Sequence, residues 1–145
     1  NRLCGFTLET GHPNALAPGK RPAHTLSPAM AVKDGKPLIS FGTPGAASQT
    51  VTLTQIALNL VDFGMDVQAA IEAPRWAIDR EGIPMLEAEI GGDVRRALEA
   101  MGHVFGSAEA SRLLFGSAKV VMRDPDSGTI FAGADFRRYG YAIGV

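Results

Sequence analysis

The chain has 145 residues, of which 46% are hydrophobic and 20% are charged, and its formal net charge at pH 7 is −1. This length suits a single domain, and the apolar fraction suffices for one sizeable core. The scattered charges form no basic run for a nucleic-acid partner, and no apolar run reaches the roughly 18–20 residues that a membrane-spanning helix needs. The single cysteine, Cys4, excludes an internal disulfide and a cysteine-built metal site, and it leaves the cellular compartment undecided.

The first residues are expected to form a short strand followed by a rigid loop over residues 9–26. Residues 1–8 alternate loosely between apolar and polar side chains, as a strand does. Residues 13–28 hold four prolines, one glycine and no apolar periodicity, so they can be neither a helix nor a central strand. The donors that this stretch could present are Lys20, Arg21, His24, Thr25 and Ser27. An ordered surface loop without a function has the same composition.

A hairpin and an amphipathic helix are predicted next. Asp34 and Gly35 lie between two apolar runs, and both residues tolerate positive φ, so they predict a tight turn. The strands on either side are expected at residues 29–32 and 38–41. From residue 48 the apolar side chains recur at intervals of three and four, which predicts a helix that ends at Gly64.

The second half of the chain predicts two short helices among strands. Asp66 can cap a helix over residues 67–73, and a further helix is expected to begin at Asp93 and to stop at Gly102. Turn-forming residues at 125–128 predict another hairpin. The strands are expected at residues 75–78, 84–87, 118–122 and 129–132. Strands, then helices, then strands indicate an α+β fold, with helices packed on a mainly antiparallel sheet.

The sequence contains no motif for a metal or a cofactor. His12, His24 and His103 are too far apart for local ligand spacing, and there is no HExxH, CxxC or phosphate-loop pattern. We therefore expect chemistry without a cofactor. Gly91 and Gly92 precede a predicted helix and could bind an anion, but such a pair is more often a simple turn.

Five stretches of the sequence fit one known pattern. They are PNALAPGKRP at residues 13–22, GTPG at 42–45, VDFGM at 61–65 with the helix that ends at Pro74-Arg75, LEAMGH at 98–103 and AGADFRR at 132–138. In this order they resemble the small subunit of the gamma-glutamyltransferase family along the whole chain. The resemblance implies that residues 1–145 are a single domain, a fragment of that subunit. It also implies that the fold is part of the αββα sandwich of an N-terminal nucleophile hydrolase.

The chain begins with Asn1, whereas an autoprocessed hydrolase of this kind begins with threonine, serine or cysteine. In the family that the chain resembles, an N-terminal threonine attacks the γ-glutamyl amide, and that residue falls upstream of Asn1. No catalytic nucleophile is therefore expected here, and we expect a C-terminal portion of the small subunit that is inactive by itself. The resemblance implies two partners: the remainder of the same polypeptide, meaning the large subunit and the N-terminal part of the small subunit, and a small-molecule amide substrate.

Four residues fall on positions at which the family contacts its substrate. Gly45 and Ala46 match two glycines whose N–H groups form the oxyanion hole, and an ordinary strand-to-helix turn is the alternative there. His24 and Thr25 match two serines that bind the substrate α-carboxylate, and both can still donate hydrogen bonds. Thr25 could instead be a nucleophile with His24 as base, but neighbouring side chains in an extended segment point to opposite sides.

Arg2 and Gly5 depart from the family pattern at positions that bind substrate. The family's usual NQMDDF reads NRLCGF at residues 1–6. Arg2 thus replaces a glutamine, and Gly5 replaces the aspartate that holds the substrate α-ammonium. We therefore expect an altered acyl donor rather than ordinary glutathione breakdown.

Three functions stay open. The first is a gamma-glutamyltransferase-like amidohydrolase or acyltransferase. The second is a non-catalytic binding or assembly module that keeps the fold. The third is a related acylase that acts on other amides, such as acylated β-lactams, and the glycine at position 5 is the reason to retain it.

Overall fold

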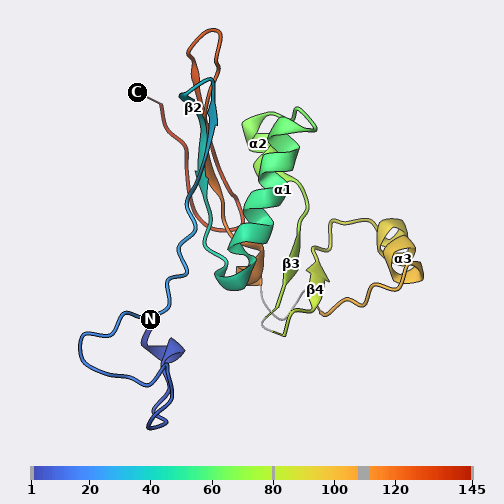
Figure 1. Ribbon diagram of the computed structural model, residues 1–145. Coiled ribbons are helices and arrows are strands. Elements are labelled where there is room, and N and C mark those ends of the chain that lie inside the picture. Colours follow the sequence, from blue (N-terminus) through green and yellow to red (C-terminus); the bar gives the residue numbers. More distant parts are fainter. Residues whose placement is uncertain (1, 80, 108–111, 145) are drawn as a thin grey trace.

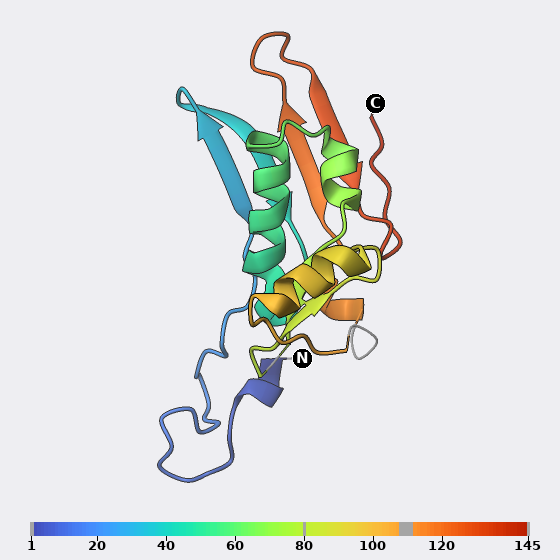
Figure 2. The same cartoon turned by 90° about the vertical axis from the view of Figure 1, so that its right-hand side faces the viewer.

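The computed structural model describes residues 2–79, 81–107 and 112–144. Its main body has two layers: a four-stranded antiparallel sheet in the order β1-β2-β5-β6, and helices α1 and α2, which cover one face of that sheet (Figure 1, Figure 2). The sheet consists of β1 (Ala29–Lys33), β2 (Lys36–Gly42), β5 (Lys119–Arg123) and β6 (Ile130–Ala134), and the two helices are α1 (Gln49–Val61) and α2 (Val67–Glu72). The α+β class predicted from the sequence is confirmed.

Smaller elements lie outside these layers. β3 (Trp76–Ile78) and β4 (Pro84–Leu86) form a separate antiparallel pair, and α3 (Gly92–Ala100) stands beyond them at the right of Figure 1. Single 3₁₀ turns occur at η1 (Arg2–Gly5), η2 (Ala46–Ser48) and η4 (Arg112–Phe115). The strands predicted from residue 29 onward all occur, with ends displaced by at most two residues.

Both predicted hairpins form around turns whose residues suit the required backbone. Asp34 and Gly35 have φ angles of 51° and 73°, as a tight turn between β1 and β2 requires. In the turn between β5 and β6, the Asp124 carboxylate accepts hydrogen bonds from the N–H groups of Asp126 at 2.8 Å and Ser127 at 2.9 Å. The side chain of Asp124, just before the predicted turn residues 125–128, thus builds the second turn.

The two helices on the sheet begin and end close to the predicted residues. α1 ends three residues before Gly64, which has a φ of 62° and so reverses the chain where few other residues could. Asp66 then caps α2, because its carboxylate accepts hydrogen bonds from the N–H groups of Gln68 at 3.0 Å and Ala69 at 2.9 Å.

The hydrophobic core lies between the sheet and the two helices. Its buried members are Ile39, Ile56, Leu60, Val67, Ala70, Ile71, Ala118 and Val120. α2 approaches β6 closely because Gly133 has no side chain: a Cβ there would lie 2.6 Å from Ile71 Cδ1 and 2.9 Å from Val67 Cγ1. The glycine therefore sets the distance between the two layers.

The strand predicted over residues 1–8 is wrong for the residues that the structure describes. The chain forms η1 and then a single bridge between Thr7 and Ala15. The Thr7 N–H donates to the Asn14 carbonyl at 3.1 Å, and the Leu16 N–H donates to the Thr7 carbonyl at 2.9 Å. Because the loop itself satisfies these backbone groups, the segment joins no sheet, and it projects from the main body in both views (Figure 1, Figure 2).

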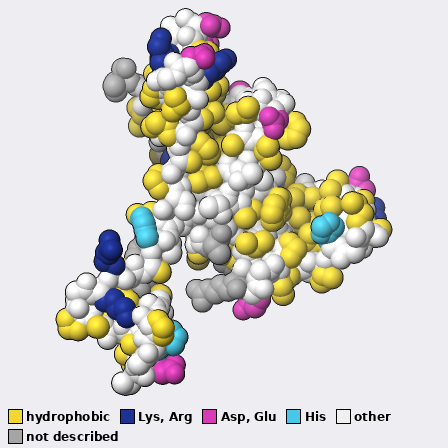
Figure 3. Space-filling model, in the orientation of Figure 1, with side chains coloured by type: hydrophobic (Ala, Val, Ile, Leu, Met, Phe, Trp, Pro, Cys, Tyr) yellow, Lys and Arg dark blue, Asp and Glu magenta, His cyan; other side chains and the backbone are white. Residues whose placement is uncertain are grey.

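Apolar side chains remain uncovered on two surfaces. On the sheet, Met30 and Val121 alternate with core residues and lie on the face away from the helices, where they are 59% and 45% exposed. None of the residues of α3 is buried, and Met101 after it is 75% exposed. Figure 3 shows hydrophobic side chains gathered over β3, β4 and α3.

Gly133→Ala is expected to destabilise the chain by about 1–3 kcal/mol, because the added methyl group would overlap Ile71 and Val67 and force the layers apart. The measurement is the free energy of unfolding in urea. Gly42→Ala is the matched control, because it adds the same group to a strand of the same sheet where no atom lies within 4 Å of the new Cβ. Equal stability of the two variants would contradict the close approach.

Candidate functional site

The turn that connects β2 to α1 has an unusual backbone. Gly45 has a φ of 152° and a ψ of 15°, and Ala46 has a φ of 50°. The positive φ of Ala46 costs about 1–2 kcal/mol, so the residues packed around the turn must hold Ala46 in this conformation. Neither the Gly45 N–H nor the Ala46 N–H donates to an acceptor within residues 2–79, 81–107 and 112–144. The turn therefore has two adjacent backbone N–H groups without an acceptor in these ranges, one on the buried Gly45 and one on the exposed Ala46.

Helix α1 begins directly after this turn and anchors it. The Ser48 N–H donates to the Gly45 carbonyl at 2.9 Å. The buried Ser48 hydroxyl donates to the Ile78 carbonyl at 2.8 Å and accepts from the Ile78 N–H at 3.0 Å. The turn is thus bonded to β3 as well as to its own helix, and the positive end of the α1 dipole lies next to the two donors.

One hydrogen bond brings the proline-rich loop to the same place. The Ser27 N–H donates to the Gln49 Oε1 at 3.2 Å, and Gln49 is buried at the first position of α1. His24 and Thr25, both exposed, precede Ser27 by three and two residues. The structure therefore ties Ser27, which closely follows the predicted carboxylate-binding pair, to the first residue of α1, which closely follows the predicted oxyanion pair.

Arg2 and Gly5 are not brought to this turn. They lie in the projecting N-terminal segment, apart from the start of α1 in both views (Figure 1, Figure 2). Gly5 is exposed, and no atom lies within 4 Å of the position that a Cβ would take there. Its carbonyl accepts a hydrogen bond from the Asn14 side chain. The contact of Arg2 and Gly5 with a substrate stays a prediction.

A buried ion pair lies where several elements end. Arg75 Nη1 is 2.7 Å from Asp135 Oδ2, and the two side chains are 2% and 0% exposed. The same guanidinium donates to the Phe115 carbonyl at 2.9 Å and to the Ile71 carbonyl. The Arg75 main-chain N–H donates to Glu87 at 2.8 Å. One arginine therefore connects α2, β4, η4 and β6.

Arg137 extends this network. Its guanidinium pairs with both carboxylate oxygens of Glu87, at 2.6 Å and 2.5 Å, and it lies 3.2 Å from Asp135 Oδ1. It also donates to the carbonyls of Ile71 and Ala73, each at 3.0 Å, at the end of α2. A cation bonded to the last carbonyls of a helix is favourable, because these groups carry the negative end of the helix dipole.

Asp135 stays ionised despite its burial. Burial raises the pKa of a carboxyl group, but hydrogen bonds from the N–H groups of Arg137 and Ala118 and the charge of Arg75 outweigh this effect, so the pKa of Asp135 lies below its ordinary value. Burial lowers the pKa of Arg75, and yet a guanidinium remains charged at any pH at which the chain folds. The pair is therefore a true ion pair.

Sequence reasoning did not identify these four charged residues as a group. Arg75 and Asp135 are 60 positions apart, and no local spacing connects them. The available signal was their place in the chain: Arg75 and Asp135 directly flank short apolar strands, where a charge must be either exposed or paired. Only the fold shows that they are paired with each other.

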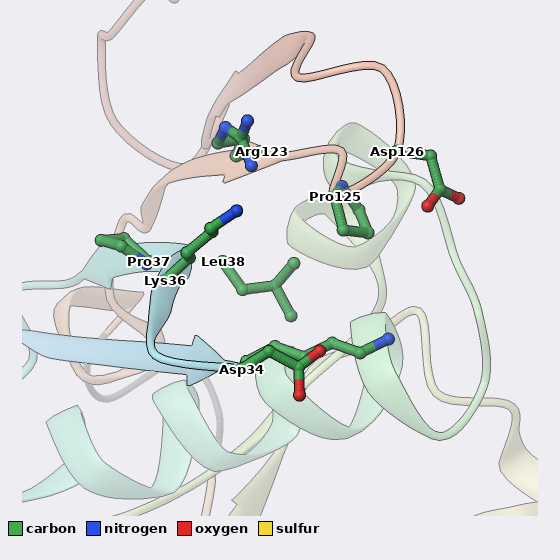
Figure 4. A pocket seen from close by; sticks show the side chains of 8 residues that line it. Asp34, Lys36, Pro37, Leu38, Arg123, Pro125 and Asp126 are labelled. Carbon is green, nitrogen blue, oxygen red and sulfur yellow. The ribbon is translucent and has the colours of Figure 1, made fainter.

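A cavity of about 310 Å³ lies away from these residues. The cavity lies between the tips of the two hairpins, beyond Ile39 and Met122, the last paired residues of β2 and β5 at that end (Figure 4). It is lined by Lys33, Asp34, Lys36, Pro37, Leu38, Arg123, Pro125 and Asp126. Because β2 runs from this cavity to the turn at residues 43–46, the two lie at opposite ends of one strand.

The described part of the chain shows neither a metal site nor a membrane span. Residues 2–79, 81–107 and 112–144 contain no group of three or more His, Cys, Asp or Glu side chains that could hold a metal ion. None of the helices in these ranges is long and apolar enough to cross a membrane.

Comparison with known proteins first defines the class of fold. The chain superimposes on gamma-glutamyltranspeptidase of Helicobacter pylori (T380A mutant) with a TM-score of 0.78 at 22% identity, covering 94% of this chain and 79% of that one. It superimposes on cephalosporin acylase of Bacillus halodurans with a TM-score of 0.80 at 34% identity, covering 94% of this chain and 25% of that one. The fold is that of the N-terminal nucleophile hydrolases, as predicted.

The sequence comparisons then establish the family. The gamma-glutamyltranspeptidase family model matches residues 2–145. The glutathione hydrolase-like YwrD proenzyme of Bacillus subtilis (strain 168) is 37% identical over 151 aligned positions, which cover 100% of this chain and 28% of that protein. The chain therefore belongs to the gamma-glutamyltranspeptidase family, which confirms the resemblance, and it spans about a quarter of the length of the curated relatives that it matches.

Asp135→Asn is expected to lower the stability at pH 7 by about 3–5 kcal/mol, because it leaves the charge of Arg75 buried without a counter-charge. A carboxyl group whose folded-state pKa lies below its unfolded value of about 3.9 adds stability above that value and loses it as the pH falls toward the folded pKa. Urea unfolding from pH 7 down to pH 3 should therefore show a steeper acid loss for the wild type than for Asp135→Asn. Asp126→Asn, on the exposed second turn, is the control. If the wild type, Asp135→Asn and Asp126→Asn all lose stability with the same slope as the pH falls, Asp135 is not the source of the acid loss.

Proposed function

We propose that this chain is the C-terminal portion of the small subunit of a gamma-glutamyltransferase-like amidohydrolase or acyltransferase that matures from a longer proenzyme. The observation that carries the proposal is the turn at Gly45 and Ala46. Two adjacent backbone donors, held in positive φ at the start of a helix, are the group that acyl transfer from an amide requires.

In the proposed reaction, a nucleophilic hydroxyl from outside this chain attacks the amide carbonyl of the donor. The carbonyl oxygen gains negative charge as the tetrahedral intermediate forms, and the N–H groups of Gly45 and Ala46 stabilise that charge. Each such donor is worth about 2.7–4 kcal/mol of transition-state stabilisation. The hydroxyl proton passes through a base to the leaving amine, and the resulting acyl-enzyme ester is then cleaved by water in hydrolysis or by an acceptor amine in transfer.

His24 and Thr25 are proposed to bind a carboxylate of the donor. Both residues can donate a hydrogen bond to an anion, and Ser27 ties their segment to the start of α1. A carboxylate held there would place the rest of the donor near the two backbone donors. The support is the hydrogen bond that ties Ser27 to the start of α1, together with the match to the family pattern.

The nature of the donor is proposed from Arg2 and Gly5. A glycine at position 5 supplies no counter-charge for a substrate α-ammonium, whereas an arginine at position 2 can pair with a carboxylate through two hydrogen bonds. A donor without the α-ammonium, such as a glutaryl amide, is therefore favoured over a γ-glutamyl amide. The likeness to a cephalosporin acylase makes a related acylase the second candidate.

The remainder of a longer polypeptide is the proposed partner. The chain matches only about a quarter of each curated relative; its own fold leaves apolar side chains uncovered on the outer face of the sheet, and no residue of α3 is buried. Contiguous apolar surface of this kind marks a contact with other protein.

The isolated chain is expected to have no amidase activity. The nucleophile of the proposed reaction lies outside this chain, and the side chains of His24 and Thr25, which could replace it as base and hydroxyl, are neighbours in an extended segment and point to opposite sides. The measurement is release of the chromophore from a γ-glutamyl anilide by the chain alone. Turnover that disappears in Thr25→Ala would sink the proposal, because it would show that Thr25 is an internal nucleophile.

The donor preference is tested in the full-length, processed protein. The wild type should accept a glutaryl anilide at least as well as a γ-glutamyl anilide, which differs from it only by the ammonium group. Gly5→Asp should raise the relative kcat/KM for the γ-glutamyl donor by about tenfold, which corresponds to the roughly 1.4 kcal/mol of a modest ion pair. Gly144→Asp, which adds the same charge near the C-terminus, is the control. A strong wild-type preference for γ-glutamyl donors that Gly5→Asp leaves unchanged would contradict the role of residue 5.

A further inference from the structure

The backbone of residues 114–118 packs directly on the turn at residues 43–46. A Cβ built on Gly116 would lie 2.3 Å from Thr43 Oγ1 and 2.8 Å from the Pro44 carbonyl oxygen, and Gly116 has a φ of 79°. The Cβ position of Gly45 lies 3.4 Å from the Leu114 carbonyl oxygen. Two backbone segments far apart in sequence thus touch, and glycine at position 116 permits it.

One hydroxyl group connects the two segments. Thr43 Oγ1 donates to the Pro44 carbonyl at 2.7 Å and accepts from the Ser117 N–H at 2.9 Å. Thr43 is only 9% exposed, so water competes little for these bonds. The hydroxyl therefore holds the residues just before Gly45 against Ser117, which precedes β5 in the second half of the chain.

The far side of the same segment is held by the buried ion pair. Arg75 donates to the Phe115 carbonyl at 2.9 Å, and the Ala118 N–H donates to Asp135 Oδ2 at 3.0 Å. Residues 115–118 are therefore bonded on one side to the ion pair and on the other side to Thr43. A segment held in this way is a rigid support for the turn.

We propose that Thr43 is a positioning residue for the oxyanion turn: its hydroxyl, held between Pro44 and Ser117, keeps Gly45 and Ala46 in the positive-φ conformation that presents their N–H groups. This inference rests on the proposed function. Ala46 stores about 1–2 kcal/mol of backbone strain, which is close to what one or two buried hydrogen bonds contribute. Without the hydroxyl the turn can relax, and the donors then point away from the developing oxyanion.

The test uses the full-length, processed protein with an anilide donor that the wild type cleaves. Thr43→Val removes the hydroxyl and keeps the shape, and it should lower kcat by about tenfold or more while KM changes by less than about threefold, because the lost interaction acts only on the transition state. Thr43→Ser keeps the hydroxyl and should retain at least about a third of the wild-type kcat. Thr54→Val is the control, because its hydroxyl donates to the Thr50 carbonyl on the exposed face of α1.

Thermal melting is recorded for every variant, so that lost activity is separated from lost folding. If Thr43→Val does not fold, Thr43→Ala carries the same test, because it removes the hydroxyl without placing a new apolar branch against Ser117. If the wild type is an amidase and a folded variant without the hydroxyl keeps the wild-type kcat, the positioning role of Thr43 is overturned. A folded, processed wild type that cleaves no anilide donor overturns the proposed function, and this inference with it.

Discussion

The ion pair between Arg75 and Asp135 is the constraint on which the rest of the structure depends. Both side chains are almost fully removed from water, so the burial of either charge without the other would be strongly destabilising. The guanidinium donates to the carbonyls of Ile71 in α2 and Phe115 in η4. The carboxylate accepts from the N–H of Ala118, just before β5, and from the N–H of Arg137, shortly after β6. The two charges thus fix the ends of α2, η4, β5 and β6 relative to one another. Arg137 and Glu87 complete the network.

This constraint reaches the candidate site through a single short segment. Residues 115–118 bond to the ion pair on one side and to Thr43 on the other, and Gly116 lets the two backbones touch. The strained turn at Gly45 and Ala46 thus rests on a support that is itself anchored in the core. Such an arrangement agrees with the general finding that backbone strain persists only where the surroundings over-determine it. The charged network and the proposed oxyanion turn are parts of one construction.

The proposed reaction needs a group that the proposed site residues do not supply. The N–H groups of Gly45 and Ala46 are proposed to stabilise an oxyanion, and His24 and Thr25 are proposed to bind a carboxylate, but none of these interactions attacks an amide, so the nucleophile is proposed to come from outside this chain. The uncovered sheet face and the exposed sides of α3 indicate where further protein would pack.

Local chemistry was enough to predict most helices, strands and turns. Asp34-Gly35 and residues 125–128 predicted the hairpin turns, Asp66 predicted the start of α2, and the three-and-four spacing after residue 48 predicted α1. The strand predicted over residues 1–8 failed because strand formation needs a neighbour, and the loop bonded those residues instead. The sequence pattern also pointed to Gly45, Ala46, His24 and Thr25, through their match to a family. Only the tertiary structure decided that Ser27 bonds to Gln49 at the start of α1, that Arg75 pairs with Asp135 across 60 positions, and that Thr43 meets Ser117 across 74. Contacts of that kind arise from the packing of whole layers, and no local spacing encodes them.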